Sequence, residues 1–284
     1  MAAFANGPAD GEVPQPHQFG PYFLHELINR GGMAEIWLAT DESKQTCAVR
    51  RLHSVGTFDF TTKKRFFRGC EVLSKISHHP LVISYLNHGK INGTPYCAME
   101  YIEGNNLKLL FAEGDPLLQE NIGEILLDMA SALEHVHDSG FMHLDYKPEN
   151  VIVSRNASLR LVDFDLALEK PEKPIKLKSN PGTPAYMAPE QLLRQPLDAR
   201  VDIFAFGVSA YELLTNEKPF PGETPDEILR KQLQRSDFKR PRELNPDIPV
   251  KLEAVILKCI ETDMDQRYPY MSVLIRDLQQ ALYV

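Results

Sequence analysis

Three side chains with oxygen donors stand at short intervals near the middle of the sequence. Asp145 and Asn150 lie in the string HLDYKPEN, and Asp163 follows in the string VDFD. A carboxylate such as Asp145 can accept or orient the proton of a hydroxyl group, and amide and carboxylate oxygens are ligands that magnesium accepts. This order and spacing predict a site for phosphoryl transfer, in which an acid faces the attacking hydroxyl and a metal ion holds the phosphates.

The composition is typical of a globular protein. The chain has 284 residues, of which 43% are apolar and 25% are charged, so it can bury a core large enough for two lobes. No run of about 18 apolar residues is present, and the N-terminus lacks a basic stretch followed by an apolar one. We therefore expect a cytoplasmic protein with no membrane partner. The net charge of −8 argues against a nucleic-acid partner.

Cysteine and histidine residues show no spacing typical of a metal site. The four cysteines are far apart and form no CxxC pair, so we expect buried free thiols. His135 and His137 are two positions apart on a predicted helix, so their side chains face different directions and have structural roles. These cysteines are Cys47, Cys70, Cys97 and Cys259.

The first third of the chain predicts a disordered leader followed by a small β lobe. Residues 1–19 are rich in proline, glycine and alanine and have little apolar surface to bury. Residues 20–103 contain five short β-type runs at 22–28, 35–40, 47–52, 81–90 and 95–102, separated by turn residues. One helical segment at 63–77 interrupts the strands. We expect a five-stranded antiparallel sheet with a single helix.

Residues 104–284 predict a larger and mainly helical lobe. Apolar residues recur with helical periodicity at 119–137, and further helices are expected at 201–215, 224–234, 250–262 and 270–282. Between the first two helices, the strand-like runs at 151–154 and 159–164 flank a short turn. The predicted fold class is therefore α+β, with two lobes and the oxygen donors in the larger one.

The order of these elements and several strings resemble the protein kinase family, in its bacterial-type Ser/Thr branch. The strings are HLDYKPENVIV, VDFDLA, GTPAYMAPEQ, DIFAFGV and DMDQRYP, and the similarity covers roughly residues 19–284. The resemblance implies a bilobal kinase fold, ATP and Mg²⁺ as cofactors, and a protein substrate or partner. Input signal and oligomeric state remain open.

The resemblance assigns roles to the polar residues of the larger lobe. Asp145 would be the catalytic base, Lys147 would contact the transferred phosphate, and Asn150 and Asp163 would bind magnesium. An alternative interpretation is that these residues only cap turns. Thr183, Asp202 and an ion pair between Glu190 and Arg267 would support the scaffold, whereas His143 and Phe164 would pack inside the motif.

The resemblance also implies a nucleotide site between the lobes. The segment INRGGMAEIWLA takes the place of the glycine-rich loop, with Asn29 at the first glycine position, where asparagine tolerates left-handed backbone. Apolar residues would sandwich the adenine, and the backbone from Met99 to Ile102 would bind its edge. The residues expected to bind nucleotide are Asn29, Gly31, Gly32, Ala34, Ile36, Ala48, Arg50, Met99, Glu100, Ile102 and Ile152.

Two departures affect the phosphate-binding cation of the family. Arg50 replaces its lysine, and arginine is longer, planar and forked, so the phosphate contact would shift. Loss of one such contact costs about 3 kcal/mol in the transition state, or on the order of a hundredfold in rate. In the family a glutamate orients this lysine, and its position is occupied here by Gly69 or Cys70. Glu71 is the nearest acid, and it would serve only if the helix rotated.

Two further departures lie in the catalytic motifs. Asp165 replaces the glycine of DFG, where it would either recruit a metal ion or repel phosphate. Leu144 replaces an arginine that usually binds an activation-segment phosphate, so control by such phosphorylation is not expected.

Three functions are consistent with this pattern. The main expectation is a pseudokinase or a strongly impaired kinase that binds MgATP and signals through partner contacts. The alternative is an active Ser/Thr protein kinase in which Arg50 has taken over phosphate positioning and Asp145 is the base. The third is a nucleotide-dependent switch for partner binding, which predicts stabilisation of the fold by ATP.

Overall fold

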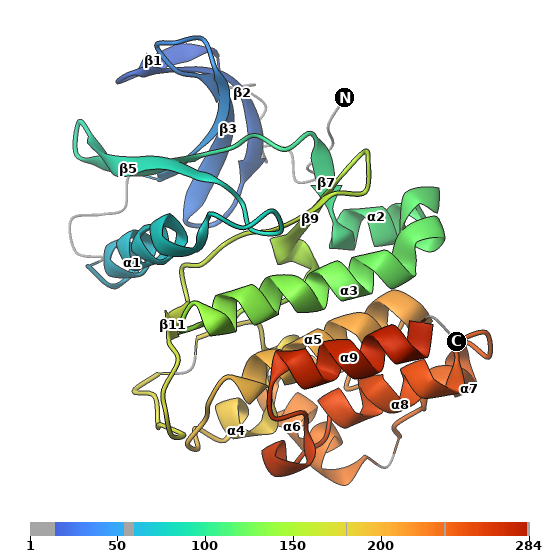
Figure 1. The fold of residues 1–284 in the computed structure, drawn as a ribbon. Helices are drawn as coiled ribbons and strands as arrows, with labels where there is room; N and C mark the ends of the chain where they lie inside the picture. The colour runs from blue at the N-terminus through green and yellow to red at the C-terminus, as the bar shows by residue number, and fades with distance from the viewer. Residues whose placement is uncertain (1–14, 54–59, 180, 236, 283–284) are drawn as a thin grey trace.

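The computed structural model describes residues 15–53, 60–179, 181–235 and 237–282, which form two lobes (Figure 1). The smaller lobe holds a six-stranded antiparallel sheet in the order β1-β2-β3-β4-β6-β5. Its strands are β1 His17–Phe19, β2 Tyr22–Arg30, β3 Ala34–Thr40, β4 Thr46–Leu52, β5 Tyr85–Ile91 and β6 Thr94–Met99, and its helix is α1 Phe60–Ile76.

The sheet has one strand more than the five predicted. Strand β1 pairs with β2 through residues assigned to the disordered leader, so that assignment was wrong for residues 17–19. Phe19 is buried and packs edge-on against Tyr96, so this short segment buries apolar surface against the sheet. The expected disorder of residues 1–14 lies outside the described residues.

Alternating burial explains how the sheet is placed. Successive side chains of β3 are alternately buried and half-buried, with Trp37 and Ala39 inside one small core on the outer face. Helix α1 covers the other face and buries Phe66, Gly69, Cys70 and Leu73. The face of α1 that contains Gly69 borders the cavity between the two lobes.

The larger lobe is built around a helix that is buried on nearly every side. This helix, α5, spans Arg200–Thr215, and its apolar residues extend around the whole circumference. Helix α9, Met271–Leu282, packs against α3, Pro116–Asp138, and α8, Val250–Cys259, and Figure 1 shows these three helices next to one another in the larger lobe. The other helices are α2 Leu107–Glu113, α4 Pro189–Leu192, α6 Pro225–Gln234 and α7 Pro241–Leu244.

Two small sheets flank the segment that contains Asp145 and Asn150. Strand β9, Val151–Ser154, pairs with β7, Gly104–Asn106, and with β10, Leu159–Leu161. Strand β8, Phe141–Met142, pairs with β11, Leu168–Glu169. The segment 143–150 therefore leaves one small sheet and enters the other, and it includes the short 3₁₀ helix Pro148–Asn150.

The bilobal fold confirms the predicted fold class, with differences at element ends. The strand expected at 159–164 ends at Leu161, because the backbone turns into a left-handed conformation at Asp163, with φ of 63°. The strand expected at 81–90 begins only at Tyr85. All four cysteines are buried and unbridged, as predicted. Among the described residues, no helix is both long and apolar enough to span a bilayer.

Candidate active site

The backbone of the loop after β8 is held by a buried carboxylate from α5. Asp202 accepts hydrogen bonds from the amides of His143 and Leu144 at 2.8 and 2.9 Å, and its side chain contacts His137 at 2.8 Å. Burial works to raise the pKa of Asp202, but these bonds and the neighbouring histidines hold it below its usual value. The predicted bond from Asp202 to this loop is therefore present, and His137 has a structural role.

The Asp145 carboxylate lies in a hydrogen-bonded cluster. Lys147 Nζ contacts Asp145 Oδ2 at 2.7 Å and Thr183 Oγ1 at 2.7 Å. The backbone amide and the hydroxyl of Thr183 both donate to Asp145 Oδ1, at 3.1 and 3.0 Å. The Asn150 side chain donates to the Asp145 carbonyl at 2.8 Å. These contacts fix the orientation of the carboxylate, which is more than capping a turn requires.

Asn150 and Asp163 present oxygen donors to the same cleft. Both line the cavity between the lobes, and the amide nitrogen of Asn150 is committed to Asp145, so its oxygen remains as an acceptor. Burial would raise the pKa of Asp163, but the charges of Arg50 and His143 lower it, so this side chain is an anion. One carboxylate and one amide oxygen fit Mg²⁺, which takes few protein ligands and completes its shell with phosphate and water.

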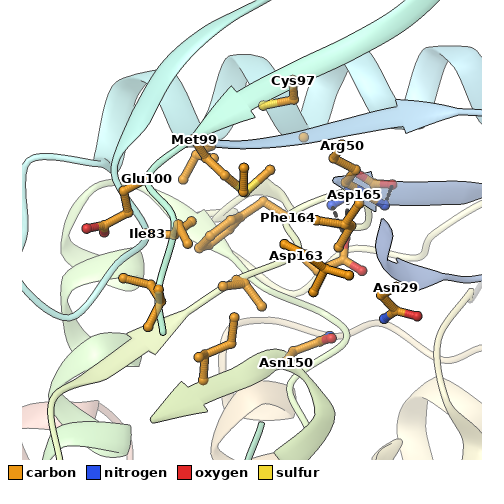
Figure 2. A pocket seen from close by; sticks show the side chains of 18 of the residues that line it. Asn29, Arg50, Ile83, Cys97, Met99, Glu100, Asn150, Asp163, Phe164 and Asp165 are labelled. Atoms are coloured by element: carbon orange, nitrogen blue, oxygen red, sulfur yellow. Dashed lines mark hydrogen bonds and ion pairs between the residues drawn. The ribbon is translucent and has the colours of Figure 1, made fainter. Parts of the chain in front are cut away.

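Arg50 enters the cleft from β4 and has a carboxylate partner (Figure 2). Its two terminal nitrogens donate to the two oxygens of Asp165 at 2.8 and 2.7 Å, and Nη1 lies 3.5 Å from Asp163 Oδ1. Both side chains of the Arg50–Asp165 pair are only 18% exposed. Arg50 therefore has an acidic partner in Asp165, in place of the acid that the family has on α1.

The structure explains why no acid of α1 takes part. Gly69 is the position that faces Asp165, and a Cβ atom there would lie 2.8 Å from Asp165 Oδ1. Glu71, the candidate substitute, is exposed, and no ion pair links it to another described residue. The idea that Asp165 repels phosphate or recruits a metal did not anticipate its bond to Arg50. The available signal in the sequence for this bond was the set of complementary changes at positions 50, 69 and 165.

The cavity between the lobes is lined by most of the residues predicted to bind nucleotide. Strand β6 pairs with β4, so Met99 lies across from Ala48 and Cys97 from Arg50. This register also brings Cys97 to the cleft, where Ile28, Leu73, Ile83 and Phe164 join it without having been predicted to bind. The predicted residues that line the cavity are Asn29, Ile36, Ala48, Arg50, Met99, Glu100, Ile102, Asn150, Ile152 and Asp163.

The backbone of the predicted phosphate loop remains in strand conformation at Asn29. Asn29 is part of β2 and pairs with Ile36, so it has no left-handed conformation. The turn closes through a hydrogen bond from the Gly31 amide to the Ala34 carbonyl at 2.9 Å. Gly32 has open space where a Cβ atom would stand. Gly31, Gly32 and Ala34, which were predicted to bind nucleotide, are not among the residues that line the cavity.

Asp145 borders a second cavity that adjoins the first. Arg50, Asp163, Asp165 and Thr183 also line it, and the first three line the larger cavity as well, so the two cavities share one border. The predicted scaffold ion pair is present as well, because Arg267 donates to Glu190 at 2.7 and 2.8 Å inside the larger lobe. Leu144 is buried beside this site, where the family has an arginine.

Comparison with known proteins agrees with this geometry. A model of the protein kinase domain matches residues 22–278. A probable serine/threonine-protein kinase of Streptomyces coelicolor is 31% identical over 271 residues, which cover 93% of this chain and 40% of that protein. Serine/threonine-protein kinase PknB of Mycolicibacterium smegmatis is 31% identical over 274 residues, which cover 94% of this chain and 43% of that protein.

A probable serine/threonine-protein kinase of Clostridium acetobutylicum is 32% identical over 262 residues, or 92% of this chain and 40% of that protein. The chain thus spans less than half the length of these relatives. Since the family model covers all but the ends of the sequence, the chain belongs to the protein kinase family.

Proposed function

We propose that this chain is the catalytic domain of an active Ser/Thr protein kinase, which transfers the γ-phosphoryl group of ATP to a protein hydroxyl. The observation that supports this most directly is the fixed Asp145 carboxylate. It is held by Lys147 and Thr183 at the border of a cavity that also contains Asp163 and Arg50. A general base must lie within hydrogen-bond reach of its proton, and a fixed orientation lowers the entropy cost of that approach.

The other polar residues have complementary roles in this proposal. Lys147, which bridges Asp145 and Thr183, brings a positive charge to the position where charge develops on the transferred phosphoryl group. Asn150 and Asp163 would hold Mg²⁺, which supplies neutralising charge to the phosphate oxygens when it is bound. The apolar side chains at the other end of the cleft, among them Ile36 and Ile152, would pack against adenine.

The expectation of impaired activity was motivated by the changes at Arg50, Gly69, Asp165, Asn29 and Leu144, and chiefly by the missing lysine–glutamate pair. The Arg50–Asp165 ion pair weakens that argument, since a guanidinium held by a carboxylate lines the nucleotide cleft. We therefore favour phosphoryl transfer over a domain that only binds nucleotide. The similar proteins of Streptomyces coelicolor and Mycolicibacterium smegmatis are named serine/threonine-protein kinases, which supports Ser/Thr specificity. A protein as the phosphate acceptor is part of the proposal.

Substitution of the proposed base tests the function. Asp145→Asn keeps the size of the side chain but removes its ability to accept a proton, so the transfer rate should fall by roughly 10²- to 10⁴-fold. Transfer from MgATP to a generic Ser/Thr protein substrate is measured, together with nucleotide affinity, which should change little. Asp247→Asn is the matched control, because Asp247 is exposed in the larger lobe and should leave transfer unchanged.

Two outcomes contradict this function. Wild-type protein that binds MgATP without transferring phosphate would favour the nucleotide-dependent signalling interpretation. Transfer that persists at the wild-type rate in Asp145→Asn would show that Asp145 is not the base.

A further inference from the structure

The acid that binds Arg50 comes from the same chain segment as the proposed metal ligand. Asp165 is two residues after Asp163, and the Arg50 guanidinium contacts the carboxylates of both. A planar guanidinium that donates two bonds to one carboxylate has a defined orientation, unlike an ammonium group. The ring of Phe66 from α1 lies 5.3 Å from the guanidinium carbon and limits its movement further.

The bidentate contact leaves Arg50 able to bind another anion. A guanidinium carries five N–H donors, and the two bonds to Asp165 use only part of them. The Arg50–Asp163 contact of 3.5 Å is longer than the two bonds to Asp165, so Asp163 is the less committed of the two carboxylates. Because the pair is mostly shielded from water, its electrostatic contacts are stronger than those of a surface pair.

Helix α1 makes room for the carboxylate instead of supplying it. A Cβ atom at Gly69 would lie 2.8 Å from Asp165 Oδ1 and 2.9 Å from the backbone nitrogen and Cα of Asp165. Contacts this short to backbone would force the Asp163–Asp165 segment to move. Arg68, the neighbouring residue on α1, donates to the Asp165 carbonyl at 2.9 Å and so helps to hold the segment against the helix.

We propose that Asp165 is a positioning residue, which orients Arg50 toward the nucleotide phosphates in place of an acid on α1. This inference rests on the proposed nucleotide site, and it adds that phosphate binding by Arg50 depends on Asp165. The cation and the metal ligand Asp163 are held by one short segment, so they assemble or separate together. Helix α1 contributes the space at Gly69 together with the contacts of Phe66 and Arg68, and it supplies no acid to the pair.

The affinities for MgATP and for adenosine test this role without requiring turnover. Asp165→Asn keeps the shape of the side chain but removes the charge that orients Arg50. Its affinity for MgATP should fall by about tenfold or more, because Arg50 loses the bidentate contact that fixes its orientation. Its affinity for adenosine, which has no phosphate, should stay within about twofold of the wild-type value.

A double-mutant cycle shows whether Asp165 acts through Arg50. Arg50→Met should weaken MgATP binding at least as much as Asp165→Asn, and the double variant should bind no more weakly than Arg50→Met alone. Arg240→Met is the matched control, because Arg240 pairs with Glu253 at 2.9 Å in the larger lobe. This control should leave both affinities unchanged.

Three results would overturn the positioning role. Unchanged or tighter MgATP binding by Asp165→Asn would mean that Asp165 does not hold Arg50 in its binding position. Equal losses for adenosine and MgATP would indicate a general structural defect. If the losses of MgATP affinity in Asp165→Asn and Arg50→Met added up in the double variant, the two residues would act independently. None of these results depends on whether Asp145 supports transfer, so the two proposals fail independently.

Gly69→Ala provides a second test from the opposite side of the pair. The added methyl group should displace Asp165 and weaken MgATP binding by about tenfold, again with little effect on adenosine. Gly123→Ala on α3 is the control, because a Cβ atom there would meet the Leu282 side chain at an ordinary distance of 3.4 Å. Wild-type affinity for MgATP in folded Gly69→Ala would contradict the steric requirement.

Discussion

At the scale of single residues, burial decides which charged contacts hold the larger lobe together. The Arg267 side chain is fully buried and donates two hydrogen bonds to Glu190. The Lys239–Glu217 pair has the same charges at 3.6 Å, but both of its side chains are more than half exposed. Water screens the exposed pair, whereas the buried guanidinium has no solvent to replace a lost partner.

Removal of the Glu190 charge should therefore destabilise the fold strongly. Glu190→Gln leaves the Arg267 charge buried without a carboxylate, which costs about 3 to 5 kcal/mol of unfolding free energy. Glu217→Gln, the matched change in the exposed pair, should cost less than about 1 kcal/mol. Urea unfolding of both variants measures the difference. Equal losses in the two variants would show that burial of this pair is not the source of its contribution.

At the scale of elements, the ends of helices follow their capping residues. Helix α3 begins at Pro116, because Asp115 accepts a hydrogen bond from the Leu117 amide and proline fixes the first helical residue. The sequence predicts this helix from its apolar periodicity but starts it at residue 119, since the cap precedes the periodic residues. The turn at Asp163 was missed for a different reason, because apolar strand-like residues lead directly into it.

Loss of the cap should have a small and local effect. Asp115→Ala leaves the Leu117 amide without its side-chain acceptor, so the unfolding free energy should fall by about 1 kcal/mol. Asp247→Ala, at an exposed position outside the helices, is the control and should change stability by less than about 0.5 kcal/mol. A loss in Asp115→Ala no larger than in the control would rule out the cap as a stabilising feature.

At the scale of the whole molecule, the sequence predicts the two lobes and the polar cluster better than it predicts their junction. Asp145 and Asn150 lie in one continuous motif, so their proximity follows from local spacing. Arg50 and Asp165 are 115 residues apart, and only the packing of β4, α1 and the Asp163 turn brings them together. Pairing across that distance depends on tertiary structure, which is why this ion pair escaped prediction.

The contact between Gly69 and Asp165 also constrains which residues can replace these two. A Cβ atom at position 69 would meet both the side chain and the backbone of residue 165, so a larger residue there requires the 163–165 segment to move. An acid placed at position 69 would also bring a second carboxylate against Asp165. Transfer of the acidic partner of Arg50 from residue 165 to this position of α1 therefore requires changes at both positions.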